Sequence, residues 1–260
     1  MTLPDPRTTE LAQHLGAVRE RIETAMAARQ ASTVADAAAA PPTLIVVTKF
    51  HPAADVLRLR SLGVADVGEN RDQEAAAKAA EVAVTDLRWH FIGQLQSNKA
   101  KSVVGYAHSV HSIDRVSVAT ALGKAMARQQ ETDGRADLQC FIQVELTDPY
   151  ASLAAEGHDV PAGPSGRGGA SPSSVLQLAE HIAGTPGLML AGVMGVAPLG
   201  VTPGPAFELL ANVSAQLRST HPGATGISAG MSHDLEAALA AGATHLRVGS
   251  DILGPRPAVL

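Results

Sequence analysis

The strongest constraint on the fold is an alternation of short apolar segments with helical patterns along most of the chain. The apolar segments are rich in branched residues, which is typical of strands buried on both faces of a parallel sheet. A helical pattern lies in each of the seven gaps between them. We expect strands at 44–48, 64–67, 89–92, 110–113, 138–146, 188–193, 225–228 and 244–248, and helices at 53–62, 71–82, 95–103, 114–130, in a stretch ending at 181, and at 204–219 and 233–241.

Eight β/α units of this kind predict an α/β protein built as a closed (β/α)₈ barrel of the TIM type. The length of 260 residues fits this fold, which typically takes about 250 residues. A doubly wound open sheet is the alternative, but no G-x-G-x-x-G motif follows the first strand. We therefore expect a single domain over 1–260, with the barrel at 44–257.

An additional helix is expected before the barrel. Asp5 is a suitable N-cap, and Pro6 suits the first helical position. The helix is expected at 6–29, and an Ala-rich stretch at 31–42 reads as a linker. The apolar residues of this helix recur at helical spacing, at Leu11, Leu15, Val18 and Ile22.

The composition excludes several classes of protein. The 45% hydrophobic content argues against disorder, and no apolar run approaches the about 20 residues of a membrane span. The net charge of −5 argues against a general nucleic-acid surface. Cys140 is the single cysteine, so no intramolecular disulfide forms, and the histidines have no metal-ligand spacing. We expect a soluble, cytoplasmic protein without a metal site.

The first candidate for chemistry is Lys49, which directly follows the first strand. The active site of a (β/α)₈ barrel lies at the carboxyl ends of its strands, so we expect the amine to point into the barrel mouth. A desolvated lysine there has a lowered pKa and forms a Schiff base with a carbonyl compound. The alternative is that it reaches solvent or pairs with Asp66 or Glu69. The other lysines fall in predicted helices, where exposure is ordinary: Lys78, Lys99, Lys101 and Lys124.

The second candidate is an anion site after the seventh and eighth strands, where barrels often bind phosphate. Gly230 precedes a predicted helix that Ser232 can cap, and Gly249-Ser250 forms a second small turn. Ordinary turn chemistry explains the same residues. Together with Lys49, however, they indicate a ligand that carries both an aldehyde and a phosphate, and pyridoxal 5'-phosphate (PLP) fits this description.

The third candidate is Arg247 in the eighth strand. Strand alternation places it on the same side as Gly249, so it can face the same ligand. A barrel-facing arginine needs a partner, and the pyridine nitrogen of PLP is one candidate. A structural pair with Asp66, Glu69 or Glu145 is the alternative.

At these residues the chain resembles the PLP homeostasis protein family, formerly described as proline-synthase co-transcribed proteins. The resemblance covers about 44–257, and its most specific parts are the Trp-His-Phe-Ile-Gly stretch at 89–93 and the Gly-Met-Ser-x-Asp stretch at 230–234. Thr48 and Ser250 replace a more usual Ser and Thr, and an insertion at 159–173 is longer than expected. The matching segments are 47–49, 67–70, 89–99, 111–115, 192–194, 228–238 and 247–250.

The resemblance implies an alanine-racemase-type barrel, PLP fold type III, without that enzyme's C-terminal β-domain. It implies PLP held as an internal aldimine on Lys49, with Arg247 at the ring nitrogen. Asn70 and Met194 would line the face or edge of the ring. Phosphate contacts would come from Ser228, Gly230, Met231, Gly249 and Ser250.

Two functions are compatible with such a site. The first is a PLP carrier or buffer in vitamin B6 homeostasis, and the second is a PLP-dependent amino-acid racemase-like enzyme. Such an enzyme needs a second base from an additional domain, but the chain ends twelve residues after Val248, and its two tyrosines are Tyr106 and Tyr150. We therefore expect a monomeric carrier without appreciable catalytic activity. Its expected partners are PLP and PLP-dependent apo-enzymes, with no nucleic acid and no membrane.

Overall fold

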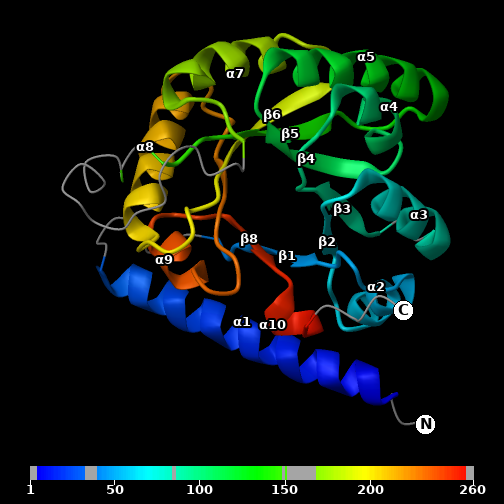
Figure 1. Cartoon of the computed structure of the whole chain (residues 1–260), viewed down its shortest axis with the longest axis vertical. Coiled ribbons are helices and arrows are strands. Elements are labelled where there is room, and N and C mark those ends of the chain that lie inside the picture. The colour runs from blue at the N-terminus through cyan, green and yellow to red at the C-terminus, as the bar shows by residue number, and fades with distance from the viewer. Residues whose placement is uncertain (1–4, 33–39, 84–85, 148–149, 151–167, 256–260) are drawn as a thin grey trace.

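Eight parallel strands close into a barrel in the order in which they follow one another along the chain, as Figure 1 shows. The computed structural model describes residues 5–32, 40–83, 86–147, 150 and 168–255. The expected (β/α)₈ barrel is therefore confirmed. Its strands are β1 (Thr43–Val47), β2 (Asp66–Glu69), β3 (Arg88–Phe91), β4 (Ala107–Ile113), β5 (Leu138–Gln143), β6 (Leu188–Met194), β7 (Gly226–Ser228) and β8 (His245–Val248).

Helices cover the outside of this barrel, and they lie in the gaps where the sequence predicts them. A further short helix that the sequence analysis missed, α10 (Ser250–Leu253), follows the last strand. Within the described ranges, no helix combines the length and the apolar character that a bilayer crossing requires. Around the barrel, the described part of the chain also forms α2 (Ala53–Ser61), α3 (Asp72–Val82), η1 (Ser97–Lys99), α4 (Ala100–Val103), α5 (Val116–Asp133), η3 (Pro172–Ser174), α7 (Val175–Ala183), α8 (Gly204–Thr220) and α9 (Leu235–Ala240).

Two strands differ from their predicted lengths by three residues: β4 begins at Ala107 instead of 110, and β5 ends at Gln143 instead of 146. The apolar run continues past β5 because Val144 and Leu146 stay buried, at 2% exposure each. Val144 forms a bridge with Ala170, outside the named strands. The apolar character of these residues therefore predicted a longer strand, because it reports burial and not strand pairing.

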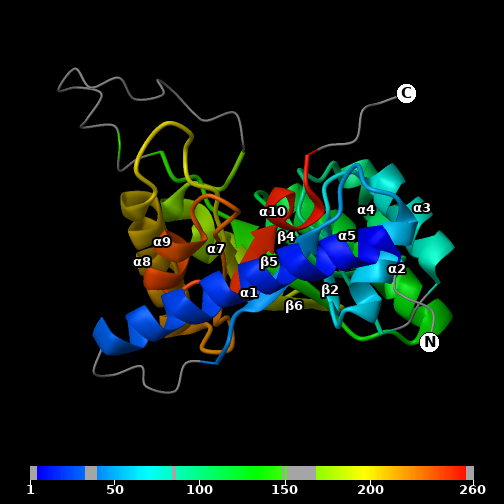
Figure 2. The same ribbon diagram turned by 90° about the horizontal axis from the view of Figure 1, so that it is seen from below.

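The expected N-terminal helix is α1 (Pro6–Ser32), three residues longer than predicted. Asp5 caps it, because its Oδ1 accepts the backbone N–H groups of Arg7 and Thr8 at 3.1 Å each. Figures 1 and 2 show α1 along the outside of the barrel, where it contacts α2, α9 and α10. All four apolar residues that predicted the helix are buried: Leu11, Leu15, Val18 and Ile22.

Two predicted segments lie largely outside the described residues. The expected linker at 31–42 is described only at 31–32 and 40–42, and the expected insertion at 159–173 only from Gly168 onward. The described end of this insertion is tied to the barrel, because the N–H of Ala170 donates to the carbonyl of Gln143 at 2.8 Å.

We expect Leu15→Ala to lower the free energy of unfolding by about 3 kcal/mol, because it leaves a cavity between α1 and the barrel. Leu15 is 1% exposed. The exposed Gln13→Ala in the same helix is the control, with an expected change within about 0.5 kcal/mol. Urea unfolding measures both. Equal stability of the two variants would show that α1 is not docked through this face.

Candidate functional site

A cavity of about 400 Å³ opens at the carboxyl ends of the strands. Its walls come from the segments that follow β1, β2, β3, β7 and β8, together with Val196 after β6. Two histidines, His51 and His233, also line it. Six of the site residues expected from the sequence meet in this cavity: Lys49, Asn70, Met231, Arg247, Gly249 and Ser250.

Lys49 reaches the cavity because of strand alternation. Val47 and Lys49 both line it, as expected for residues two apart along an extended chain. Thr48, between them, belongs to the opposite, outer face of the barrel, where its hydroxyl donates to Glu69 at 2.6 Å. The sequence prediction that Lys49 lies at the barrel mouth agrees with this placement.

The expectation that the lysines in helices are exposed is wrong for Lys78. Lys78 is only 7% exposed, and its Nζ lies 2.8 Å from Glu69 and 2.7 Å from Glu74. It packs in the interface between α3 and the outer face of β1 and β2. The alternating alanines and charges of α3 give no apolar stripe that would have marked this position as buried.

Arg247 is buried at 4% exposure, and it lines the cavity. It donates to the Ser228 hydroxyl at 2.6 Å and to the Gly195 carbonyl at 2.9 Å. These neutral acceptors stand where the sequence analysis considered Asp66, Glu69 or Glu145 as partners. Burial lowers the pKa of Arg247 to about 10, so the guanidinium remains charged at neutral pH.

A chain of hydrogen bonds runs from Arg247 through the barrel interior. Ser228 contacts Nδ1 of His111 at 2.8 Å, and Nε2 of His111 lies 3.0 Å from Nδ1 of His90. Nε2 of His90 lies 2.8 Å from the Asp66 carboxylate. The sequence showed no metal-ligand spacing among the histidines, and it did not predict this series of hydrogen bonds. The alternation of polar residues in β3 and β4 was the signal that could have found it.

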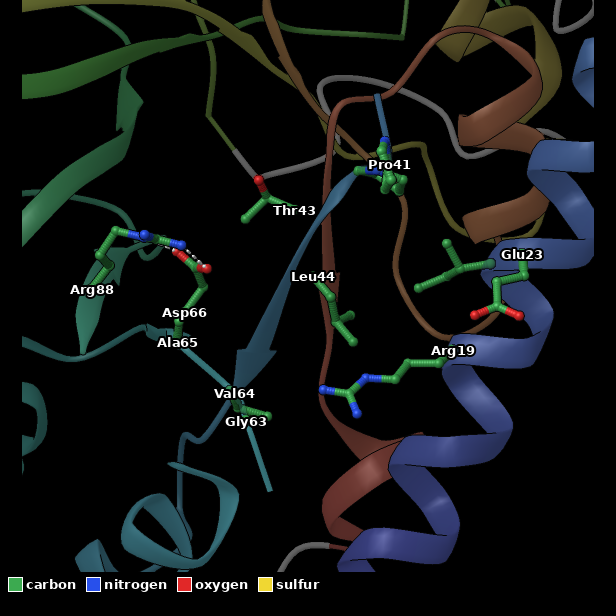
Figure 3. Close-up of a pocket in the computed structure, with 12 residues that line it drawn as sticks. Arg19, Glu23, Pro41, Thr43, Leu44, Gly63, Val64, Ala65, Asp66 and Arg88 are labelled. Carbon is green, nitrogen blue, oxygen red and sulfur yellow. Dashed lines mark hydrogen bonds and ion pairs between the residues drawn. The ribbon is translucent and has the colours of Figure 1, made fainter. Parts of the chain in front are cut away.

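Asp66, the last residue in this series of hydrogen bonds, borders a second cavity of about 380 Å³ between α1 and the amino ends of β1 and β2 (Figure 3). Arg88 and Asp66 form an ion pair on one side of it, with Nη2 and Oδ2 2.5 Å apart, and Arg19 of α1 lies on the other. This cavity lies at the end of the barrel opposite Lys49.

The barrel-interior histidines are held neutral by their surroundings. Burial lowers the pKa of His90 and His108, and it lowers that of His111 further. Burial also brings the pKa of His245 down to about 4. Arg247 therefore carries its charge among uncharged rings. No cluster of three or more His, Cys, Asp or Glu side chains within the described ranges is arranged to bind a metal.

Three residues expected at the site do not line the cavity. Met194 is 2% exposed, and it pairs in register with Ser228, whose hydroxyl is occupied by Arg247 and His111. Gly230 has φ +88°, and a Cβ there would lie 2.8 Å from the Ala238 side chain. Its glycine is therefore required by backbone conformation and by packing against α9, whatever the ligand.

The N-cap of α9, in the loop after β7, also differs from the prediction. The predicted helix at 233–241 begins at Leu235, and Asp234 takes the N-cap position that the sequence analysis gave to Ser232. The Met231 N–H donates to the Asp234 carboxylate at 2.5 Å. Ser232 instead contacts Ser250, with 3.1 Å between the two hydroxyl oxygens. The loops after β7 and β8 thus present paired hydroxyls at the cavity.

The closed eight-stranded parallel barrel places the chain in the fold class of alanine-racemase-type barrels. The alanine racemase of Corynebacterium glutamicum superposes with a TM-score of 0.63 at 14% identity, covering 96% of this chain and 62% of that enzyme. At this identity the likeness shows the fold alone.

Comparison with curated relatives identifies the family within this fold class. No family model matches the chain. The pyridoxal phosphate homeostasis protein of Corynebacterium glutamicum is 43% identical over 216 residues, which cover 82% of this chain and 90% of the relative. The protein of that name from Escherichia coli K12 is 31% identical over 253 residues, with coverage of 95% and 97%. The chain therefore belongs to the pyridoxal phosphate homeostasis protein family.

A solved structure supports the same assignment. PipY of Synechococcus elongatus, determined with PLP bound, superposes with a TM-score of 0.72 at 28% identity. The superposition covers 94% of this chain and all of PipY. The family resemblance expected from the sequence is confirmed.

The lowered pKa of His245 makes stability depend on pH. Folding favours the neutral ring, so its contribution is complete above the unfolded pKa of 6.5 and is lost as pH falls toward about 4. We expect the free energy of unfolding to fall by about 3 kcal/mol from this group between about pH 7 and pH 4. Urea unfolding across this range measures the change.

His245→Phe should make this pH dependence shallower without removing it, because burial also lowers the pKa of His90 and His111. The exposed His233→Gln should leave the pH dependence as it is in the wild type. An unchanged slope in His245→Phe would contradict the assignment.

Proposed function

We propose that this protein binds PLP in the cavity at the carboxyl end of the barrel and serves as a PLP carrier or buffer in vitamin B6 homeostasis. The observation that carries the proposal is that Lys49, Arg247 and Ser250 line one cavity, although they come from opposite ends of the chain. Family membership and the PLP-bound structure of PipY support it.

The residues present fit the three functional groups of PLP. Lys49 offers a primary amine for the aldehyde, and Arg247 offers unused N–H donors for the ring nitrogen, because only two of its five are engaged in the hydrogen bonds described above. Ser232 and Ser250 offer hydroxyls for the phosphate. The cavity of about 400 Å³ is within the range of small-molecule sites.

PLP supplies an aldehyde that condenses with an amine: a carbon–nitrogen bond forms, and the carbonyl oxygen leaves as water. Lys49 provides this amine. Arg247 has N–H groups but no acceptor, so a ring nitrogen facing it accepts a hydrogen bond and remains unprotonated. An unprotonated ring is a weaker electron sink than a protonated one, but this feature alone does not separate a carrier from a racemase-like enzyme.

A PLP-dependent racemase-like enzyme is the alternative function. The two tyrosines of the chain lie away from the cavity: the Tyr106 hydroxyl contacts Asp72 at 3.5 Å, and the Tyr150 hydroxyl donates to the Thr202 carbonyl at 2.7 Å. Neither is placed to supply a phenolic base. The histidines that line the cavity, His51 and His233, are the bases that such an enzyme would use.

Borohydride reduction tests the covalent link. We expect it to fix PLP on the peptide that contains Lys49, and Lys49→Ala to abolish the fixed label while retaining weaker PLP binding through the phosphate. Lys124→Ala, at an exposed position of α5, is the control and should label as the wild type does. Peptide mass spectrometry locates the label. A label on Lys99 or Lys101 would overturn the proposal.

An amino-acid assay separates the carrier from the enzyme. We expect no appreciable racemisation of alanine or serine, since neither tyrosine reaches the cavity, but measurable transfer of PLP to an apo-enzyme acceptor. Chiral chromatography and recovery of acceptor activity are the two readouts. Ordinary racemase turnover that disappears in Lys49→Ala and in His233→Ala would establish the enzyme instead.

A further inference from the structure

The peptide groups on both sides of Lys49 are bonded to charged side chains on the outer face of the barrel. The Thr48 carbonyl accepts a hydrogen bond from Lys78 Nζ at 2.8 Å. The Phe50 N–H donates to Oε1 of Glu74 at 2.5 Å. The backbone that carries Lys49 is therefore held at two points, one before and one after it.

Lys78 joins these two points into one network. Its ammonium has three N–H donors, and the structure gives it three acceptors: the Thr48 carbonyl, Glu69 and Glu74. The same Glu74 oxygen accepts from both Lys78 and Phe50. We refer to Glu69, Glu74 and Lys78 as the Lys78 network.

Glu69 and Lys78 are buried and Glu74 is half-buried, which makes the geometry of the network demanding. Glu69 is 1% exposed, and its Oε2 has no hydrogen-bond partner within the described part of the chain. Burial raises the pKa of Glu69, while its hydrogen bonds with Lys78 and Thr48 oppose that rise. A buried ammonium and carboxylate tolerate little displacement, because each would lose its partner.

The turn that the network supports has an unusual backbone. Phe50 has φ +69°, in the left-handed region that residues with a Cβ seldom adopt. The Arg71 guanidinium lies 5.2 Å from the centroid of the Phe50 ring and supports the same turn. Such a conformation persists when surrounding contacts determine it, and the bond from Phe50 to Glu74 is one of these contacts.

The network and the Lys49 amine lie on opposite faces of the barrel wall. Thr48 and Glu69 face the helix α3, whereas Val47 and Lys49 face the cavity. The network thus has no direct access to a ligand in the cavity. It contacts the site through the hydrogen bonds to the backbone on either side of Lys49.

We propose that the Lys78 network is a positioning device that holds the backbone of Lys49, so that its amine meets the aldehyde of the bound cofactor. This inference rests on the proposed function. Lys78 is a positioning residue in it, and Lys49 is the group that reacts. The alternative is that Lys78 only attaches α3 to the barrel.

The test compares two ligands that share a phosphate. PLP has the aldehyde, and pyridoxine 5'-phosphate has a hydroxymethyl group in its place and forms no covalent link. Full-length protein freed of cofactor with hydroxylamine is mixed with PLP, and the rate of covalent attachment is followed by absorbance. Affinity for pyridoxine 5'-phosphate is measured by calorimetry on the same samples.

Lys78→Met should slow covalent attachment by about tenfold, because a displacement of about 1 Å in a reacting group costs as much as about 100-fold. Its affinity for pyridoxine 5'-phosphate should stay within about twofold of the wild type, because non-covalent binding does not need the amine aligned. Glu74→Gln, which keeps the size of the side chain, should also slow covalent attachment. It replaces Lys78→Met in the test if Lys78→Met does not fold.

Arg135→Met is the matched control. Arg135 is also a cation that donates to main-chain carbonyls, those of Val104 and Ala107, but it lies at the opposite end of the barrel beside the start of β4. Its loss should lower thermal stability and leave both the attachment rate and the analogue affinity within about twofold.

The outcomes separate the inference from the function on which it rests. Attachment at the wild-type rate in Lys78→Met and Glu74→Gln, with the wild-type label on Lys49, would overturn the positioning role alone. An equal loss of attachment rate and analogue affinity would show a general structural role and overturn it as well. A wild-type label on another lysine would overturn both proposals.

Discussion

The pairing of the first strand with the last is the constraint on which the site depends. β1 and β8 pair in parallel, with Ile45 opposite Arg247 and Val46 opposite Val248. This register brings the segment after β1 beside the segment after β8, although about 200 residues separate them in the chain. Lys49 and Ser250 therefore meet in one cavity only because the barrel closes.

Two polar networks lie on the two faces of the barrel sheet. Inside the barrel, Arg247 donates to a hydroxyl and a carbonyl, and that hydroxyl in turn contacts the neutral His111, so among the described residues no carboxylate in direct contact cancels the charge of Arg247. Outside the barrel, the Lys78 network pairs its charges under α3. The inner network leaves a cation facing the cavity, and the outer one holds the backbone of the lysine beside it.

Much of this arrangement could be predicted from the sequence, because it follows from periodicity. Apolar strands alternating with helices predict a barrel, and the carboxyl ends of its strands locate Lys49, Asn70 and Arg247 at one cavity. Asp5 was identified as a cap because the residue types at a helix start are restricted. These features depend on local patterns that few residues determine.

The remainder could not be predicted, because it depends on contacts between distant segments. Nothing in the alanine-rich α3 distinguishes the buried Lys78 from an exposed lysine. Ser228 has a hydroxyl suited to a phosphate, but the structure directs it to Arg247 and His111. Gly230 suits an anion loop by its type, whereas its position is required by packing against Ala238. Residue type alone does not reveal which partner a side chain will meet.

The most direct test of the account is a crystal structure of the protein grown with PLP. We predict continuous electron density between the Lys49 Nζ and the former aldehyde carbon, with the ring nitrogen within hydrogen-bond distance of Arg247 and the phosphate beside Ser232 and Ser250. Arg247 should retain its hydrogen bonds to Ser228 and to the Gly195 carbonyl. Density that places the phosphate against Arg247, or PLP outside this cavity, would contradict the account.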